Sequence, residues 1–289
     1  MSIPKGFRRV TRSNPCPICK KGDWCLIARD GTKAICPRVE SSTPAGDAGF
    51  AHSLDGSPIA IRFEREERPV TIDAEAMHRA YQEAIADDEV FALSAALGVP
   101  ASSLVSMGVG RAIEWCEGTY SFPMRDADGR IIGLRLRNLD GHKWAVTGSR
   151  SGLFYDPELP HVGRVCVCEG PTSAAALLAM GFDPIGRPSN SAGTEILKAM
   201  IAKTKPDVVI VSEMDGKGEC DVCRDNYCLK CHPGQVGADK AADALIGTAR
   251  TVKVIEPLIG KDIRDWFKAG CTREDVLAVV KNTPTWGLR

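Results

Sequence analysis

The sequence lacks any long hydrophobic run. No apolar stretch in the 289 residues approaches the roughly 20 that a membrane helix requires. The polar, basic start of the chain also lacks the apolar segment of a secretory signal. These absences argue against a membrane-spanning or secreted protein, so we expect a cytoplasmic protein with no membrane partner.

A phosphate-binding loop of the form Gly-x-x-x-x-Gly-Lys-Ser/Thr is also missing. The nearest approach, Gly216-Lys217-Gly218, has neither the spacing nor the hydroxyl residue. The sequence shows no internal repeat and no coiled-coil pattern. We therefore expect no ATP-driven motor of that class and no repeat architecture.

The chain also has no net charge, because it contains 37 basic and 37 acidic residues. A neutral chain argues at first against a nucleic-acid partner, but the charge is unevenly spread. Residues 1–38 carry nine Lys or Arg against two Asp. Even if a zinc ion with four thiolates subtracts two charges, this segment keeps about +5, which favours phosphate binding.

Cysteine, in contrast, is abundant, with 12 residues. A cytosolic chain keeps its thiols reduced, so clustered cysteines indicate metal ligation rather than disulfides. The first cluster has the spacing C-x2-C-x5-C-x10-C, and a C-x2-C knuckle places two thiolates on one turn, as zinc requires. The alternative is an oxidised loop without metal. The predicted ligands are Cys16, Cys19, Cys25 and Cys36.

A second cluster places four cysteines within twelve residues. We interpret residues 219–234 as a zinc-stapled insertion, with an iron–sulfur cluster as the alternative. His232 is available but unnecessary as a ligand. The predicted ligands are Cys220, Cys223, Cys228 and Cys231. The other four cysteines are interpreted as buried or incidental; they are Cys116, Cys166, Cys168 and Cys271.

Periodicity and composition predict an α/β protein with several parts. A helical pattern covers 73–97 and another 101–107, and Asp128-Gly129 is a hairpin signal within a small antiparallel sheet at 110–155. In strict alternation, Arg135 and Arg137 share one face of that sheet. The predicted parts are a zinc-binding domain at 1–40, a linker at 41–70, an α+β subdomain at 71–160, an α/β domain at 161–260 and a terminal segment at 261–289.

After residue 161, apolar strands alternate with helices, which is typical of a mostly parallel sheet. The predicted strands are 164–168, 183–187, 207–211 and 251–256. The helix that follows the first strand begins at Pro171, a favourable first-turn residue, and ends at Gly181.

Acidic residues follow three of these apolar segments. Ligands of open α/β sheets gather at the carboxyl ends of the strands, so the carboxylates should meet there and bind Mg²⁺ or Mn²⁺. The alternative for each acid is a solvated loop residue, and Asp265 is also a candidate cap for a helix near Trp266. The residues concerned are Glu169, Glu213, Asp215, Asp262 and Asp265.

The acidic motifs resemble the TOPRIM domain of primases, topoisomerases and related nucleases. The resemblance lies in strand-Glu169-Gly170 and in Glu213-x-Asp215-x-x-Gly218. The stretch Asp128-Gly-Arg-Ile-Ile-Gly133 resembles the region before TOPRIM in bacterial primases, and Lys261-Asp262-x-x-Asp265-Trp266 is similar to the third acidic motif of phage and plasmid primases. The implied fold is a Rossmann-like TOPRIM sheet with a preceding α+β subdomain and an amino-terminal zinc-binding domain.

The resemblance implies a DNA primase, a nucleotidyltransferase that makes RNA primers on single-stranded DNA from ribonucleoside triphosphates. It implies a metal or acid–base role for Glu169, metal ligation by Glu213, Asp215 and Asp262, and phosphate contacts by Arg137 and Lys143. From the same resemblance we expect a replicative helicase or replication initiator as a partner in trans. We also expect the protein to come from a mobile genetic element or a phage.

Two features depart from the family pattern. Glu213 stands where the motif has Asp, which moves the carboxylate by about one bond length, and the cysteine-rich insertion follows the same loop. Two other functions are retained as alternatives: a non-catalytic recombination mediator with zinc and TOPRIM domains, and a TOPRIM nuclease. A topoisomerase is disfavoured because the chain is too short for a domain that supplies a nucleophilic tyrosine.

Overall fold

The computed structural model of the chain describes residues 6–43, 45, 48–57, 71–216, 228 and 231–287. The chain divides into two compact units, Met1–Arg68 and Pro69–Arg289. Each has its own buried core, so each is described separately. Within the described residues, no helix combines the length and apolar character needed to cross a bilayer.

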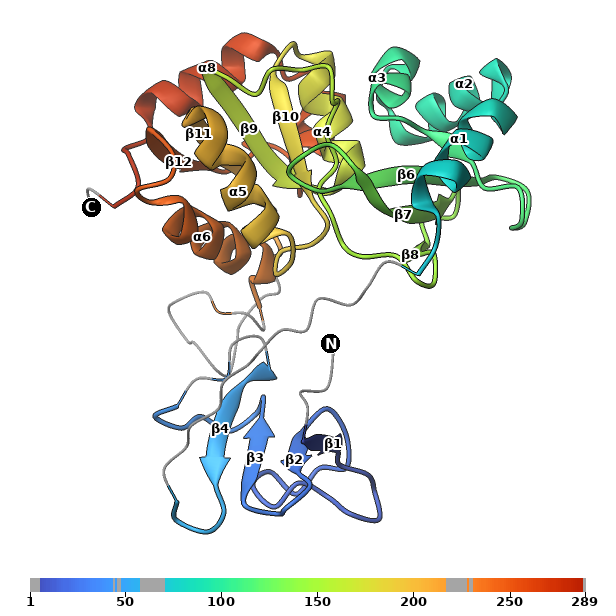
Figure 1. The fold of residues 1–289 in the computed structure, drawn as a ribbon. Helices are drawn as coiled ribbons and strands as arrows, with labels where there is room; N and C mark the ends of the chain where they lie inside the picture. The colour runs from blue at the N-terminus through green and yellow to red at the C-terminus, as the bar shows by residue number, and fades with distance from the viewer. Residues whose placement is uncertain are drawn as a thin grey trace. The chain divides into compact units, whose positions relative to one another are not determined.

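The smaller unit is built on an antiparallel sheet with the strand order β1-β2-β3-β4 (Figure 1). The strands are β1 Phe7–Arg9, β2 Leu26–Ala28, β3 Lys33–Cys36 and β4 Phe50–Ser53. The predicted linker at 41–70 is wrong for β4, which pairs with β3. The Ser- and Gly-rich composition concealed a strand whose small residue Ala51 is fully buried opposite Ile35.

The larger unit begins with three helices. The predicted helix at 73–97 is broken in two, because Ile85 has an extended backbone and the Glu89 carboxylate accepts a hydrogen bond from the Ala86 N–H at 3.1 Å. Acidic residues favour a helix N-terminus, so Asp87 to Glu89 start a new helix there. The helices are α1 Ala74–Ala84, α2 Asp87–Leu97 and α3 Ala101–Ser106.

The predicted small antiparallel sheet follows, with the order β5-β6-β7-β8. Its strands are β5 Gly110–Arg111, β6 Thr119–Arg125, β7 Ile131–Asn138 and β8 Lys143–Ala145. Leu134 and Leu136 on β7 are fully buried in a cluster that includes Tyr81 of α1. The opposite face therefore carries Arg135 and Arg137, as the alternation predicts.

A parallel sheet forms the centre of the larger unit, in the order β10-β9-β11-β12 (Figure 1). The strands are β9 Arg164–Glu169, β10 Asp183–Arg187, β11 Asp207–Val211 and β12 Thr251–Ile255. The pattern-based prediction of these strands is confirmed to within one residue at every end. The central strands β9 and β11 carry buried apolar residues on both faces, which suits a sheet covered on both sides.

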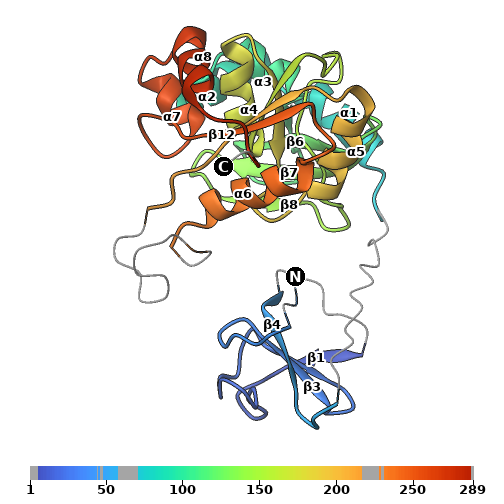
Figure 2. The ribbon, with the colours of Figure 1, turned by 90° about the vertical axis from the view of Figure 1, so that its left-hand side faces the viewer.

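Helices cover both faces of the parallel sheet. Figure 2 shows α6 on one side of β12, with α7 and α8 on the other. Residues of α5 and α6 share a core with Val165 and Val167, whereas α4, α7 and α8 pack on the face of Cys166 and Cys168. Each fully buried Val, Leu or Ile contributes about 1.5–3 kcal/mol. The helices are α4 Gly170–Ala179, α5 Thr194–Thr204, α6 Pro233–Leu245, α7 Ile263–Lys268 and α8 Arg273–Asn282.

The antiparallel and parallel sheets are directly connected. Phe154 and Gly186 exchange backbone hydrogen bonds of 2.8 and 2.7 Å, which attaches the segment after β8 to the edge strand β10. Gly186 is required there, since a Cβ atom would lie 2.6 Å from the Gly170 carbonyl oxygen. Tyr120 and Phe122 of β6 also share the core of α4. These contacts fix the basic face of one sheet relative to the strand ends of the other.

Candidate metal and catalytic sites

The first cysteine cluster forms the predicted tetrad. The four sulfur atoms lie within 4.8 Å of one another, and only Cys19 is partly exposed. The knuckle is closed by a 2.9 Å hydrogen bond from the Lys20 N–H to the Cys16 carbonyl, with Lys20 in a left-handed conformation. Four converging thiolates suit a tetrahedral zinc ion. The tetrad contains Cys16, Cys19, Cys25 and Cys36.

Arg38 stabilises the thiolate form of Cys19, whereas burial raises the pKa of Cys25 and of Cys36. Its Nη1 lies 3.7 Å from the Cys19 sulfur and 3.5 Å from the Cys25 sulfur, while Nη2 pairs with Asp23 at 2.8 Å. Burial alone would raise the pKa of Cys19, but hydrogen bonds from the Lys21 backbone, Cys25 and Arg38 bring it down to about 6. Zinc binds the deprotonated sulfur, so these hydrogen bonds favour ligation.

The second cysteine cluster is described only in part. Cys228 and Cys231 have their sulfur atoms 3.7 Å apart, and the His232 Nδ1 lies 2.9 Å from the Cys231 sulfur. Cys220 and Cys223, with much of the predicted insertion at 219–234, lie outside the described residues. Both the zinc and the iron–sulfur interpretations of this cluster therefore stay predictions.

The remaining four cysteines lie outside both clusters. Cys166, Cys168 and Cys271 are buried, and Cys116 is exposed. Burial raises the pKa of the Cys166 thiol to about 12, which keeps it protonated at neutral pH. Buried, protonated thiols behave as small apolar side chains.

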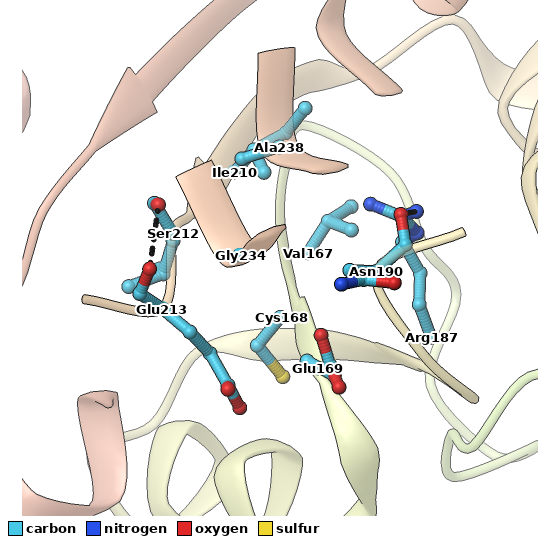
Figure 3. Close-up of a pocket in the computed structure, with 11 residues that line it drawn as sticks. Val167, Cys168, Glu169, Arg187, Asn190, Ile210, Ser212, Glu213, Gly234 and Ala238 are labelled. Carbon is cyan, nitrogen blue, oxygen red and sulfur yellow. Dashed lines mark hydrogen bonds between the residues drawn. The ribbon is translucent and has the colours of Figure 1, made fainter. Parts of the chain in front are cut away.

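The predicted acids lie at the carboxyl ends of neighbouring parallel strands. β9 ends at Glu169, and the loop after β11 carries Glu213 and Asp215. Figure 3 shows the carboxylates of Glu169 and Glu213 on either side of Cys168. β10 lies on one side of β9 and β11 on the other, so the site occupies the point where the strand order reverses. Open α/β sheets bind ligands at this position.

The side chains of Glu213 and Asp215 both form an ion pair with Lys261, which lies in a distant part of the chain. The Lys261 Nζ lies 3.2 Å from Glu213 Oε2 and 2.8 Å from Asp215 Oδ1. Each carboxylate side chain is 16% exposed. Both therefore face one point where a positive charge is stabilised, and hard carboxylate oxygens are the ligands that Mg²⁺ and Mn²⁺ prefer. Two acids thus offer hard oxygen donors at one point, whereas the cysteine tetrad is the one group in the described part of the chain that brings three or more potential ligand atoms within 4.8 Å of one another.

In the third acidic motif, Asp262 and Asp265 have different structural roles. Asp262 is the N-cap of α7 and accepts a 2.8 Å hydrogen bond from the Asp265 N–H. The alternative of an Asp265 cap near Trp266 is wrong, because the helix begins at Ile263. Asp265 instead accepts a hydrogen bond from the Lys261 N–H at 3.2 Å. It thereby holds the backbone that carries Lys261.

Burial changes the acidity of the central carboxyl groups. Loss of water and, to a smaller extent, the charge of Glu213 raise the pKa of Glu169 from its ordinary 4.5 to about 7, against the opposing effect of Arg187. Burial also raises the pKa of Glu213, although Lys261 opposes this. Clustered carboxylates of this kind are poised to bind a cation.

Basic side chains from the antiparallel sheet lie close to the acids. Arg137 and Lys143 are cross-strand partners on β7 and β8. Arg137 is only 7% exposed, and its Nε and Nη1 find no hydrogen-bond partner in the described part of the chain. Burial and the charge of Arg264 lower the pKa of Arg137. Buried N–H donors beside like charges are suited to an anionic ligand such as phosphate.

Lys143 and Arg135 also belong to this basic face. Loss of hydration and the charges of Arg137 and Arg264 lower the pKa of Lys143, while Glu213 and Asp262 oppose the shift. Arg135 donates to the Pro188 carbonyl at 3.1 Å and so contacts the loop after β10. The two sheets thus bring cations and carboxylates together at one site.

Sequence reasoning missed two components of the site. Arg187 is 5% exposed, donates to the Gly237 carbonyl at 3.0 Å and lowers the pKa of Glu169. It ends a predicted strand, so the strand-end rule applied to basic residues as well as acidic ones would have identified it. The other component is the N-terminus of α6, where the Gly234 N–H donates to Asp215 Oδ2 at 2.9 Å.

The fold and the sites together define a class of protein. In chain order it has a zinc-binding domain, an α+β subdomain and a TOPRIM-type α/β domain. Comparison with solved structures identifies the fold as that of primases of the DnaG type. A scan of protein-family models and a search of curated proteins found no match.

Two solved structures illustrate the likeness. The Aquifex aeolicus primase, comprising its zinc-binding and RNA polymerase domains, matches 98% of this chain and 80% of its own length, with 12% identity and a TM-score of 0.51. The DnaG primase catalytic domain bound to single-stranded DNA matches 73% of this chain and 78% of its own, with 14% identity and a TM-score of 0.54. At these identities the comparison establishes the fold.

Proposed function

We propose that this protein is a DNA primase that joins ribonucleotides on a single-stranded DNA template by metal-assisted nucleotidyl transfer. The observation that carries the proposal is that Glu213 and Asp215 meet at one point, with Lys143 of the basic sheet within the electrostatic reach of Glu213 and paired across the strands with Arg137. A cation site next to a phosphate site is what the condensation of two nucleotides requires. The primase-type fold supports the same reaction class.

In this proposal, the carboxylates hold the catalytic cation. Glu213 and Asp215 bind Mg²⁺ or Mn²⁺, with Asp262 as a third ligand, and Asp265 positions the loop. A cation held by these carboxylates would neutralise charge on the triphosphate and lower the pKa of the attacking hydroxyl. Glu169, with a pKa of about 7, accepts or relays the proton of the primer 3′-hydroxyl near neutral pH.

The basic residues orient the anionic substrates. Arg137 and Lys143 contact phosphates of the nucleotide or the template, and the desolvated guanidinium of Arg137 gains most from a phosphate partner. The positively charged zinc-binding unit binds the phosphates of the template. Strand separation is then left to a helicase or replication initiator in trans.

A primer-synthesis assay tests this proposal. The protein is incubated with single-stranded DNA, labelled ribonucleotides and Mg²⁺ or Mn²⁺, and the products are resolved on a gel. We expect short RNA from the wild type and at least about 100-fold less from Asp215→Asn, because a catalytic cation contributes several kcal/mol. Asp88→Asn, an exposed carboxylate on α2, is the matched control and should retain activity.

Other outcomes of this assay would contradict the proposal. No product from the wild type, or full product from Asp215→Asn, excludes metal-assisted synthesis at this site. Salt-sensitive DNA binding without incorporation favours the recombination mediator. Cleavage of the DNA in the same buffer favours the nuclease.

A further inference from the structure

Lys261 contacts both central carboxylates yet remains open to solvent. Its Nζ lies 3.2 Å from Glu213 Oε2 and 2.8 Å from Asp215 Oδ1, and its side chain is 53% exposed. The two carboxylates are far less exposed, at 16% each. The lysine therefore reaches the acids from the solvent side of the site.

The backbone of Lys261 is held in place from two directions. The Met214 N–H donates to the Lys261 carbonyl at 2.7 Å, and the Lys261 N–H donates to Asp265 Oδ2 at 3.2 Å. The preceding Gly260 has a φ of +80°, and a Cβ atom there would lie 2.3 Å from the Asp265 Cβ. The loop is thus shaped around Asp265 so that it presents the lysine to the loop after β11.

We propose that Lys261 is a built-in counter-ion that competes with the divalent cation for Glu213 and Asp215. This inference rests on the cation site of the proposed function. An ammonium group donates hydrogen bonds to the same carboxylate oxygens that Mg²⁺ or Mn²⁺ coordinates, so one oxygen lone pair serves one of them at a time. Lys261 thereby sets the cation concentration at which the site fills.

The charges around the site explain why a cation still displaces the lysine. Glu169 and Asp262 add negative charge beside the pair: Asp262 raises the pKa of Glu213, and Glu213 raises that of Glu169, although Arg187 and Lys143 offset part of this charge. A divalent cation brings twice the charge of the ammonium to the same carboxylate oxygens. The exposed side chain lets the displaced ammonium enter water at little cost.

Cation binding in the absence of DNA and nucleotide tests the inference. Mn²⁺ affinity is measured by titration calorimetry for the wild type, Lys261→Met and Lys261→Arg. We expect Lys261→Met to bind Mn²⁺ at least about tenfold more tightly, a change of about 1.4 kcal/mol, because the competitor is gone. Lys261→Arg keeps the charge and should stay within about threefold of the wild type, or about 0.7 kcal/mol.

Lys203→Met is the matched control. Lys203 pairs with Asp128 at 2.8 Å and is 48% exposed, so the substitution removes a similar ion pair outside the acid cluster. Its Mn²⁺ affinity should equal that of the wild type. Thermal melts in chelator provide a second measurement: Lys261→Met should melt below the wild type and gain more from added Mn²⁺.

Two outcomes separate failure of this inference from failure of the proposed function. Equal or weaker Mn²⁺ binding by Lys261→Met, with normal binding by the wild type, overturns the competitive role of Lys261 alone. No Mn²⁺ binding by any variant overturns the cation site itself.

Discussion

Glu169 shows how the fold changes the chemistry of a single residue. A free glutamate is ionised at neutral pH, but burial beside Glu213 raises the pKa of Glu169 to about 7. The residue therefore changes its protonation state within the physiological range. A general base works best when its pKa lies near the working pH.

The raised pKa predicts how stability depends on pH. Folded Glu169 holds its proton more tightly than the unfolded chain does, so its contribution is fully present below pH 4.5 and is lost as the pH rises through about 7. In chelator, the wild type should lose at most about 3 kcal/mol relative to Glu169→Gln across this window. Urea unfolding at several pH values measures the difference.

Divalent cation provides the control for that experiment. Mn²⁺ favours the ionised carboxylates, so it should remove most of the loss above pH 7 in the wild type. Parallel stability profiles for the two proteins in chelator would show that Glu169 has an ordinary pKa.

At the scale of secondary-structure elements, α6 determines the position of the acid pair. Its first turn packs so closely on the loop after β11 that only glycine fits at position 234. A Cβ atom there would lie 2.6 Å from the Glu213 carbonyl oxygen and 2.8 Å from Asp215 Oδ2. The approach allows the Gly234 N–H to bind the Asp215 carboxylate, which the helix N-terminus also favours.

Gly234→Ala should therefore displace α6 and disturb the proposed cation site. We expect a loss of about 1–3 kcal/mol in stability, typical of overpacking, and Mn²⁺ binding weakened at least about tenfold. Gly216→Ala is the control, because a Cβ atom at Gly216 meets no described residue within 4 Å. Similar behaviour of the two variants, by calorimetry and urea unfolding, would contradict the role assigned to α6.

Elements were predictable wherever their signal was local. Strands β9 and β11 follow from apolar runs, β10 and β12 from the alternation of strands with helices, and the helix after β9 from Pro171 and Gly181. The break at Ile85 was not predicted, because Ala, Met and Tyr at helical spacing continue up to it. β4 was missed because its short, polar sequence becomes a strand only through pairing with β3. In such segments, pairing with a neighbouring strand decides the secondary structure more than the intrinsic strand propensity of the residues does.

At the scale of the whole molecule, the two units have separate means of stabilisation. The smaller unit depends on a core made partly of Cys16, Cys25 and Cys36. The larger unit buries extensive apolar clusters on both faces of its parallel sheet. A small domain without a large core usually needs a metal to fold.

Loss of zinc should therefore unfold one unit and spare the other. We expect Cys36→Ser to abolish metal binding by the tetrad and to make the smaller unit sensitive to protease, while the larger unit keeps its thermal transition and its Mn²⁺ affinity. Metal analysis, limited proteolysis and calorimetry measure these three properties. Unfolding of the whole chain in this variant would show that the larger unit depends on the zinc domain.

The sequence by itself determined the ligand chemistry of this protein. Cysteine spacing predicted the tetrad, and apolar runs that end in acids placed Glu169, Glu213 and Asp215 at strand ends, because such patterns are encoded within a few neighbouring residues. Only the tertiary structure decided which of these groups meet. The contact of Lys261 with the acid pair, the unpartnered burial of Arg137 and the close approach of Gly234 depend on strand order and on the packing of two sheets. Packing brings together residues that are far apart in the chain, and a pattern of neighbouring residues contains no information on such contacts.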